Sequence, residues 1–102
     1  MTTAAEHAVQ LSASTPGTLG VSGVLSFDTA ASALRTIQAA LAGNTVTQLD
    51  LAGVRHSDSA GLSCVLAVVA EAARHGHAVK VINMPTGMQV LAQVCEVDRL
   101  IG

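Results

Sequence analysis

Small polar residues gather at one point of the chain, between two strongly apolar stretches, in the run His56-Ser57-Asp58-Ser59-Ala60-Gly61. Serine, histidine and aspartate are residue types of nucleophilic and acid–base catalysis. Their spacing supplies no such site, because no base is placed to activate Ser59 or Ser63. Cys64, with His56 as its base, would lie more than one turn into the following helix, without a neighbouring positive group to lower the pKa of its thiol. The sequence therefore predicts no catalytic residue and a protein that is not an enzyme.

Metal and cofactor sites are equally unsupported by the sequence. Histidines four residues apart on a helix would indicate a zinc pair, and the chain lacks that spacing among its four histidines, which are His7, His56, His75 and His77. The glycines of the run 19–23 lie within a predicted strand and lack the lysine of a phosphate-binding loop. We predict neither a metal nor a cofactor.

Composition limits the class of protein. The 102 residues carry a net charge of −2, half of them are apolar and 12% are charged. This predicts one compact domain over residues 1–102, with a loose end at 1–6. Nucleic-acid binding is disfavoured because no basic cluster is present and Phe27 is the sole aromatic residue. The sequence shows no secretory signal and no apolar run of about 18 residues, so we expect a cytoplasmic protein with reduced Cys64 and Cys95 and no direct membrane insertion.

Hydrophobic periodicity predicts elements in the order β-β-α-β-α-β-α. The predicted strands cover residues 7–12, 18–24, 46–51 and 78–82. The first helix is capped by Ser26 or Asp28 and ends at Gly43-Asn44, the second covers 62–75, and the third starts near Pro85 with an apolar face of Met88, Leu91, Ala92 and Cys95. Strands that alternate with helices predict an α/β fold with a four-stranded mixed sheet, the first hairpin strand at an edge and the helices packed on the sheet.

The sequence predicts a cap and two distinct faces for the helix that follows the polar run. Asp58 or Ser57 is placed to cap its first turn, and Gly76 to end it. The predicted buried stripe consists of Leu62, Val65, Leu66, Val69 and Ala73. The opposite face then contains Ala60, Cys64, Ala67, Val68 and Glu71. Such a small and apolar outer face has two possible explanations: the chain is rich in alanine, or the face packs against a partner. The second explanation predicts that Val68→Lys leaves the fold intact and abolishes binding.

One motif resembles a known family. The pentapeptide Asp58-Ser59-Ala60-Gly61-Leu62, after a strand that ends in Asp50-Leu51, is similar to the signature of the STAS domain. The run 19–25 resembles the second strand of that family, and the pattern agrees from about Val9 to Leu100. The family includes anti-sigma-factor antagonists, tails of anion transporters and the MlaB-type subunits of phospholipid-transport ABC complexes, which this chain resembles most.

The resemblance implies a partner. As an MlaB-like subunit, the chain would bind the cytoplasmic ATPase of an ABC transporter, held with its permease at the inner membrane, and would serve phospholipid trafficking and outer-membrane lipid asymmetry. The implied partner-binding residues are Ser57, Asp58, Ser59, Ala60, Ser63, Cys64, Ala67, Val68 and Glu71.

Two alternatives remain open. In the first alternative to the MlaB-like subunit, the chain would be an anti-sigma-factor antagonist that a kinase anti-sigma factor phosphorylates on Ser59. In the second, it would be a module that holds a nucleotide or anion at the same helix N-terminus. Under the two partner-binding readings, Ser59→Glu or Ser59→Asp weakens binding.

Overall fold

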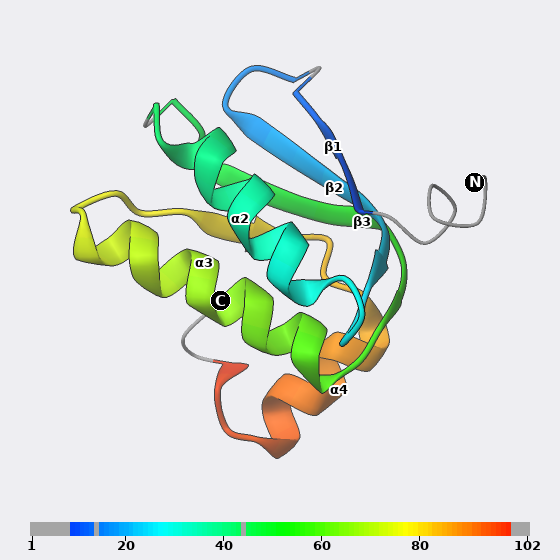
Figure 1. Ribbon diagram of the computed structural model, residues 1–102. Coiled ribbons are helices and arrows are strands. Elements are labelled where there is room, and N and C mark those ends of the chain that lie inside the picture. The colour runs from blue at the N-terminus through cyan, green and yellow to red at the C-terminus, as the bar shows by residue number, and fades with distance from the viewer. Residues whose placement is uncertain (1–8, 14, 44, 99–102) are drawn as a thin grey trace.

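The computed structural model describes residues 9–13, 15–43 and 45–98 as one sheet covered by helices (Figure 1). The predicted element order is confirmed. Along the chain the elements are β1 (Val9–Ser12), β2 (Thr18–Leu25), α2 (Ala30–Leu41), β3 (Gln48–Ser57), α3 (Ser59–Arg74), β4 (Lys80–Ile82) and α4 (Thr86–Val94). The predicted loose end at 1–6 and the histidine at position 7 lie outside the described residues.

The sheet is mixed, with the strand order β1-β2-β3-β4. β1 pairs antiparallel with β2, whereas β2–β3 and β3–β4 are parallel pairs, so the predicted edge position of the first strand is confirmed. Register shifts interrupt the β2–β3 ladder next to Gly20 and at Gly23, whose φ of 99° requires a residue without a Cβ. These glycines therefore form irregularities in a strand that pairs on both sides.

One face of the sheet carries the whole hydrophobic core. Leu19, Leu49 and Val81 stand side by side in the register of three neighbouring strands, and the helices cover them. Buried residues of all three helices, among them Ile37, Val65 and Met88, belong to the same cluster, so the helices lie on one side of the sheet (Figure 1). The other face bears mainly polar and small residues, including Gln10, Ser12, Thr18, Gln48, Asp50 and Lys80.

The central strand differs from its prediction. β3 begins two residues later than expected and continues to Ser57, because its second half pairs with the end of β2 through Val24–His56 and Leu25–Ser57. His56 and Ser57 are therefore strand residues and not parts of a turn. Asp58 alone separates the strand from α3.

Smaller differences concern the helix ends. The residue at the N-cap of α2 is Thr29, not Ser26 or Asp28, because residues 26–29 form a hydrogen-bonded turn before the helix. Pro85 is the N-cap of α4, one position before its first helical residue. Cys95, predicted on the apolar face of α4, is exposed because the helix ends there.

The orientation of α3 corrects the largest error of the sequence analysis. Cys64 and Val68, assigned to the outer face, are 4% and 0% exposed, whereas Ala73, assigned to the buried stripe, is exposed. The helix is rotated by roughly 100°, about one residue of helical turn, from the expected orientation. The physical reason is that α3 packs against the sheet and also against α2, with a smaller contact to α4, so its buried arc includes the flank that faces α2.

In the described part of the chain, no helix combines the length and hydrophobicity that a membrane crossing needs.

Candidate functional site at the N-terminus of α3

The three parallel strands run in the same direction, so their carboxyl ends point to one edge of the sheet, and a helix follows each of them. β2 and β3 end side by side at Leu25 and Ser57, whereas β4 ends level with Asp50. The turn 26–29 leads into α2, Asp58 leads into α3, and Pro85 precedes α4. In open α/β sheets, ligands bind outside the carboxyl ends of the strands. The fold thus places the polar run around Ser59 beside segments that are distant in sequence.

Asp58 joins two of these segments. Its backbone is extended, and its Oδ1 accepts a hydrogen bond from the Gly61 N–H at 3.1 Å, which confirms the predicted cap of α3. Its Oδ2 accepts a second bond from the Phe27 N–H, also at 3.1 Å. The Phe27 amide, followed by that of Gly61, lowers the pKa of the Asp58 carboxyl because both bonds favour the charged form. A single carboxylate therefore fixes the start of α3 to the turn before α2.

Gly61 allows α3 to begin close to the sheet. A Cβ at this position would lie 2.1 Å from the carbonyl oxygen of Leu25, the last residue of β2. No side chain fits there without a shift of the backbone. The glycine of the motif is thus required by close packing between the first turn of α3 and the end of β2, and not by an unusual φ angle.

Phe27 is the functional candidate that the sequence analysis missed. It is the sole aromatic residue of the chain, yet its side chain is 81% exposed. The turn that carries it is held by Thr29, whose Oγ1 accepts from the Ser26 N–H at 3.0 Å and donates to the Val24 carbonyl at 2.7 Å. The sequence does contain one indication that Phe27 is exposed, because it lies between two polar residues in a strand-to-helix turn. Its connection to the segment around Ser59, however, depends on the hydrogen bond from the Phe27 N–H to Asp58.

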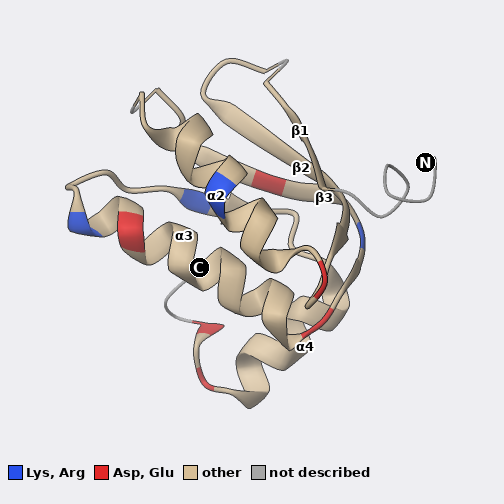
Figure 2. Cartoon of the chain, in the orientation of Figure 1, with Lys and Arg blue, Asp and Glu red and all other residues tan. Residues whose placement is uncertain are grey.

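The exposed face of α3 is small and nearly uncharged. Ser59, Ser63 and Ala70 are exposed, and Leu66 and Ala67 between them are partly exposed. These five residues lie on one side of the helix, and we call them the α3 face. The charged residues of α3, Glu71 and Arg74, are confined to its C-terminal end (Figure 2).

The structure brings together some of the predicted partner-binding residues and separates others. Ser59 and Ser63 are exposed, and Ser57, Asp58, Ala60 and Ala67 are partly exposed. Cys64 and Val68 cannot contact a partner in the folded chain, because both are core residues; burial also raises the pKa of the Cys64 thiol. Glu71 is twelve residues from Ser59, about 18 Å along the helix at 1.5 Å per residue.

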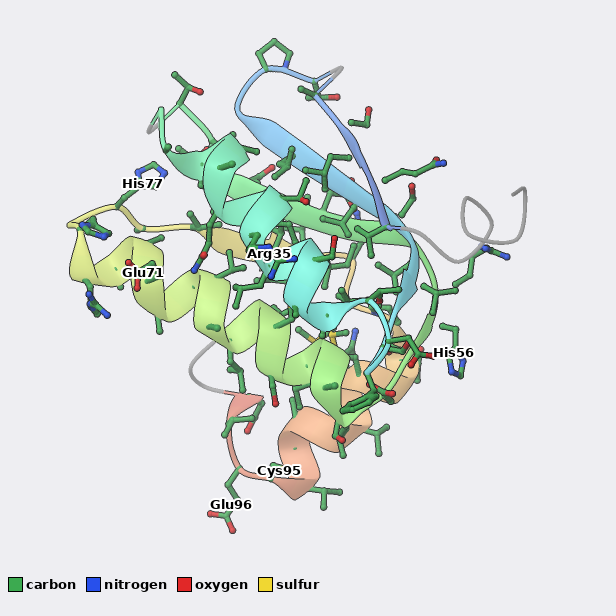
Figure 3. The ribbon with its side chains drawn as sticks, viewed as in Figure 1. Arg35, His56, Glu71, His77, Cys95 and Glu96 are labelled. Carbon is green, nitrogen blue, oxygen red and sulfur yellow. The ribbon has the colours of Figure 1, made fainter. Side chains whose placement is uncertain are left out.

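Glu71 belongs to a different region, at the C-terminal ends of α2 and α3. Its carboxylate pairs with Arg74 Nη1 at 3.1 Å and with His75 Nε2 at 2.9 Å. A cavity of about 500 Å³ lies there, lined by Gln38, Leu41, Ala42, Val68, Glu71, Ala72, His75 and His77. Figure 3 shows Glu71 and His77 at the opposite end of the helices from His56. Among the described residues, no group of histidine, cysteine or acidic side chains has the arrangement of a metal site.

The first turn of α3, capped by Asp58 and packed through Gly61 against the end of β2, contains the Asp58-to-Leu62 motif that resembles the STAS signature. The chain belongs to the STAS family: a family model described as "Mlab, STAS domain" matches residues 7–102. Among curated proteins, no sequence matches this chain significantly.

Three solved structures share the fold of this chain at low sequence identity. The anti-sigma factor antagonist SpoIIAA in its unphosphorylated form has a TM-score of 0.62 at 21% identity, with 83% of this chain and 81% of that chain covered. Bacillus SpoIIAA in its phosphorylated form has a TM-score of 0.65 at 20% identity, with 90% and 86% covered. The murine Solute Carrier 26 family member A9 anion transporter has a TM-score of 0.57 at 16% identity, with 83% of this chain but 14% of that chain covered.

Proposed function

We propose that this protein is a non-catalytic adaptor of the MlaB type, which binds the cytoplasmic ATPase of a phospholipid-transport ABC complex and stabilises or regulates it. The single observation that carries the proposal is the match of the MlaB-type STAS model over residues 7–102. Through the ATPase and its permease, the adaptor would be held at the inner membrane and would serve outer-membrane lipid asymmetry.

The geometry of the α3 face supports a packing role. A partner that covers Ser59, Ser63 and Ala67 meets no charged side chain within the first three turns of α3, because Glu71 and Arg74 lie in its last turn. Small residues also allow a partner backbone to approach closely, and the capped, close-packed first turn holds the surface in one conformation before binding. Both features reduce the free-energy cost of association, since less charge is desolvated and less chain is ordered.

The proposal is tested with the full chain and the ABC-transporter ATPase of the same organism, purified separately. We expect a stable complex in size-exclusion chromatography and a measurable Kd by calorimetry. Ser59→Glu should weaken binding at least tenfold, because it places a negative charge in a desolvated interface beside Asp58. Gln93→Glu, an exposed and charge-matched change on α4, serves as the control and should bind like the wild type. The absence of any complex with the wild-type chain would refute the adaptor function.

A second candidate function is that of an anti-sigma-factor antagonist that is switched by phosphorylation. The observation that favours it is the exposed Ser59 at the first position of α3, in a fold shared with SpoIIAA, which is known in phosphorylated and unphosphorylated forms. A phosphate there would meet the positive end of the helix dipole. The candidate predicts that protein isolated from its source carries a phosphate on Ser59 and co-purifies with a kinase anti-sigma factor. Intact-protein mass spectrometry that finds only the unmodified mass under every growth condition would count against it.

A further inference from the structure

We propose that Phe27 is the aromatic anchor of the partner-binding surface, and that Asp58 is the residue that positions it. The inference rests on the adaptor function proposed above and extends its interface from the α3 face to the turn between β2 and α2. The occupant to which we commit is the ATPase subunit, which would offer an apolar pocket for the ring and a basic side chain at the rim of that pocket.

Exposure alone does not make Phe27 a binding residue, since single exposed apolar side chains are ordinary on protein surfaces. The distinguishing feature is its connection to the candidate site. The Phe27 N–H donates to the same Asp58 carboxylate that caps α3 through Gly61, so the backbone of Phe27 and the first turn of α3 are joined by one side chain. Phe27 therefore continues the α3 face at its Ser59 end.

The turn also presents the ring in advance of binding. Besides the Asp58 bond, the Thr29 and Ala30 amides donate to the Ser26 carbonyl at 3.0 Å and 2.7 Å, and the Thr29 hydroxyl donates to the Val24 carbonyl. Only the two side-chain torsions of Phe27 remain to be ordered. An aromatic side chain on a fixed backbone supplies a large contact area at a low entropic cost, and such residues are enriched among interface hot spots.

Charge supports the stated chemistry of the occupant. Asp28 follows Phe27 in the chain and is exposed, and the Asp58 carboxylate accepts a hydrogen bond from the Phe27 backbone N–H, so two acidic residues flank the backbone of Phe27. A pocket with a lysine or arginine at its rim complements this arrangement, whereas an acidic pocket is repelled by it. The interface should therefore combine a desolvated aromatic centre with a salt-sensitive rim.

The experiment is a double-mutant cycle between Phe27 and Asp58, with the Kd for the purified ATPase as the readout. Phe27→Ala should weaken binding at least tenfold, equivalent to about 1.4 kcal/mol, with little change in Tm because the side chain is exposed. Val94→Ala, a truncation of a 74% exposed apolar side chain on α4, is the matched control and should not change the Kd. Asp58→Asn retains an acceptor for the Gly61 amide but presents its NH₂ group to the Phe27 amide, so it should release the turn.

The inference requires that Asp58→Asn weakens binding in the wild-type background and much less in the Phe27→Ala background. Equal losses in both backgrounds would show that Asp58 acts only as the cap of α3 and would refute its positioning role. Wild-type affinity of Phe27→Ala would refute the anchor while the adaptor function stands. A wild-type chain that does not bind the ATPase overturns the adaptor function, and the anchor with it. An affinity that does not decrease as salt is raised would refute the basic rim.

Discussion

Gly61→Ala tests whether the close approach of α3 to β2 is as tight as the structure shows. The new Cβ would lie 2.1 Å from the Leu25 carbonyl oxygen and must move by at least 0.9 Å to reach the 3.0 Å below which Cβ contacts are essentially absent. Neither side yields easily, because Leu25 is fully buried and its strand pairs with β3, while the first turn of α3 is held by Asp58. Overpacking of this kind costs about 1–3 kcal/mol, and we expect the upper end.

Helix propensity opposes this cost, because alanine is better than glycine in a helix by up to about 1 kcal/mol. The expected net loss is therefore about 1–2 kcal/mol. For a domain of this size that corresponds to a decrease in Tm of roughly 4–16 °C, which differential scanning calorimetry and urea denaturation resolve.

Gly87→Ala in the first turn of α4 is the matched control. A Cβ at Gly87 would meet no atom within 4 Å, so only the propensity gain remains, and the variant should be more stable than the wild type by up to about 1 kcal/mol. The two substitutions should therefore change the free energy of unfolding in opposite directions. A Gly61→Ala variant that is as stable as Gly87→Ala would show that the start of α3 does not press against the end of β2.

The remaining predictions concern the orientation of α3 and the charge of its cap. Val68→Lys should unfold the domain or lower its free energy of unfolding by about 3–5 kcal/mol, because it buries an unpaired charge. Ala70→Lys on the α3 face should preserve the Tm and weaken partner binding. Equal stability of the two variants would contradict the orientation of the helix. The lowered pKa of Asp58 predicts that its hydrogen bonds contribute stability above the unfolded-state pKa of about 3.9 and that this contribution is lost as pH falls through the lower folded-state pKa. The Tm difference between wild type and Asp58→Asn should accordingly be present at pH 7 and shrink below about pH 4. A Tm difference that grows on acidification would show that folding raises the pKa of Asp58 and would contradict this prediction.

The sequence by itself determined the fold and the position of the Asp58-to-Leu62 motif at the start of α3. Period-2 and period-3.6 patterns predicted the seven elements of the described residues and their order, because each element must turn one apolar face to the core. The cap at Asp58, the end of α3 at Gly76 and the irregularities at Gly20 and Gly23 were also predictable, since each depends on the conformational preference of a single residue type. The Asp58-to-Leu62 motif predicted the STAS family, which the match over residues 7–102 confirms.

The tertiary structure alone decided which residues face outward at that site. The periodicity of α3 shows that an apolar arc exists, but its width depends on how many neighbours pack against the helix, and the contact with α2 turns Cys64 and Val68 into core residues. The extension of β3 to Ser57 depends on its pairing with β2, a strand about thirty residues earlier. The bond between Asp58 and Phe27, 31 residues apart, is likewise a product of parallel strands that end at one edge, and no local pattern could have indicated it.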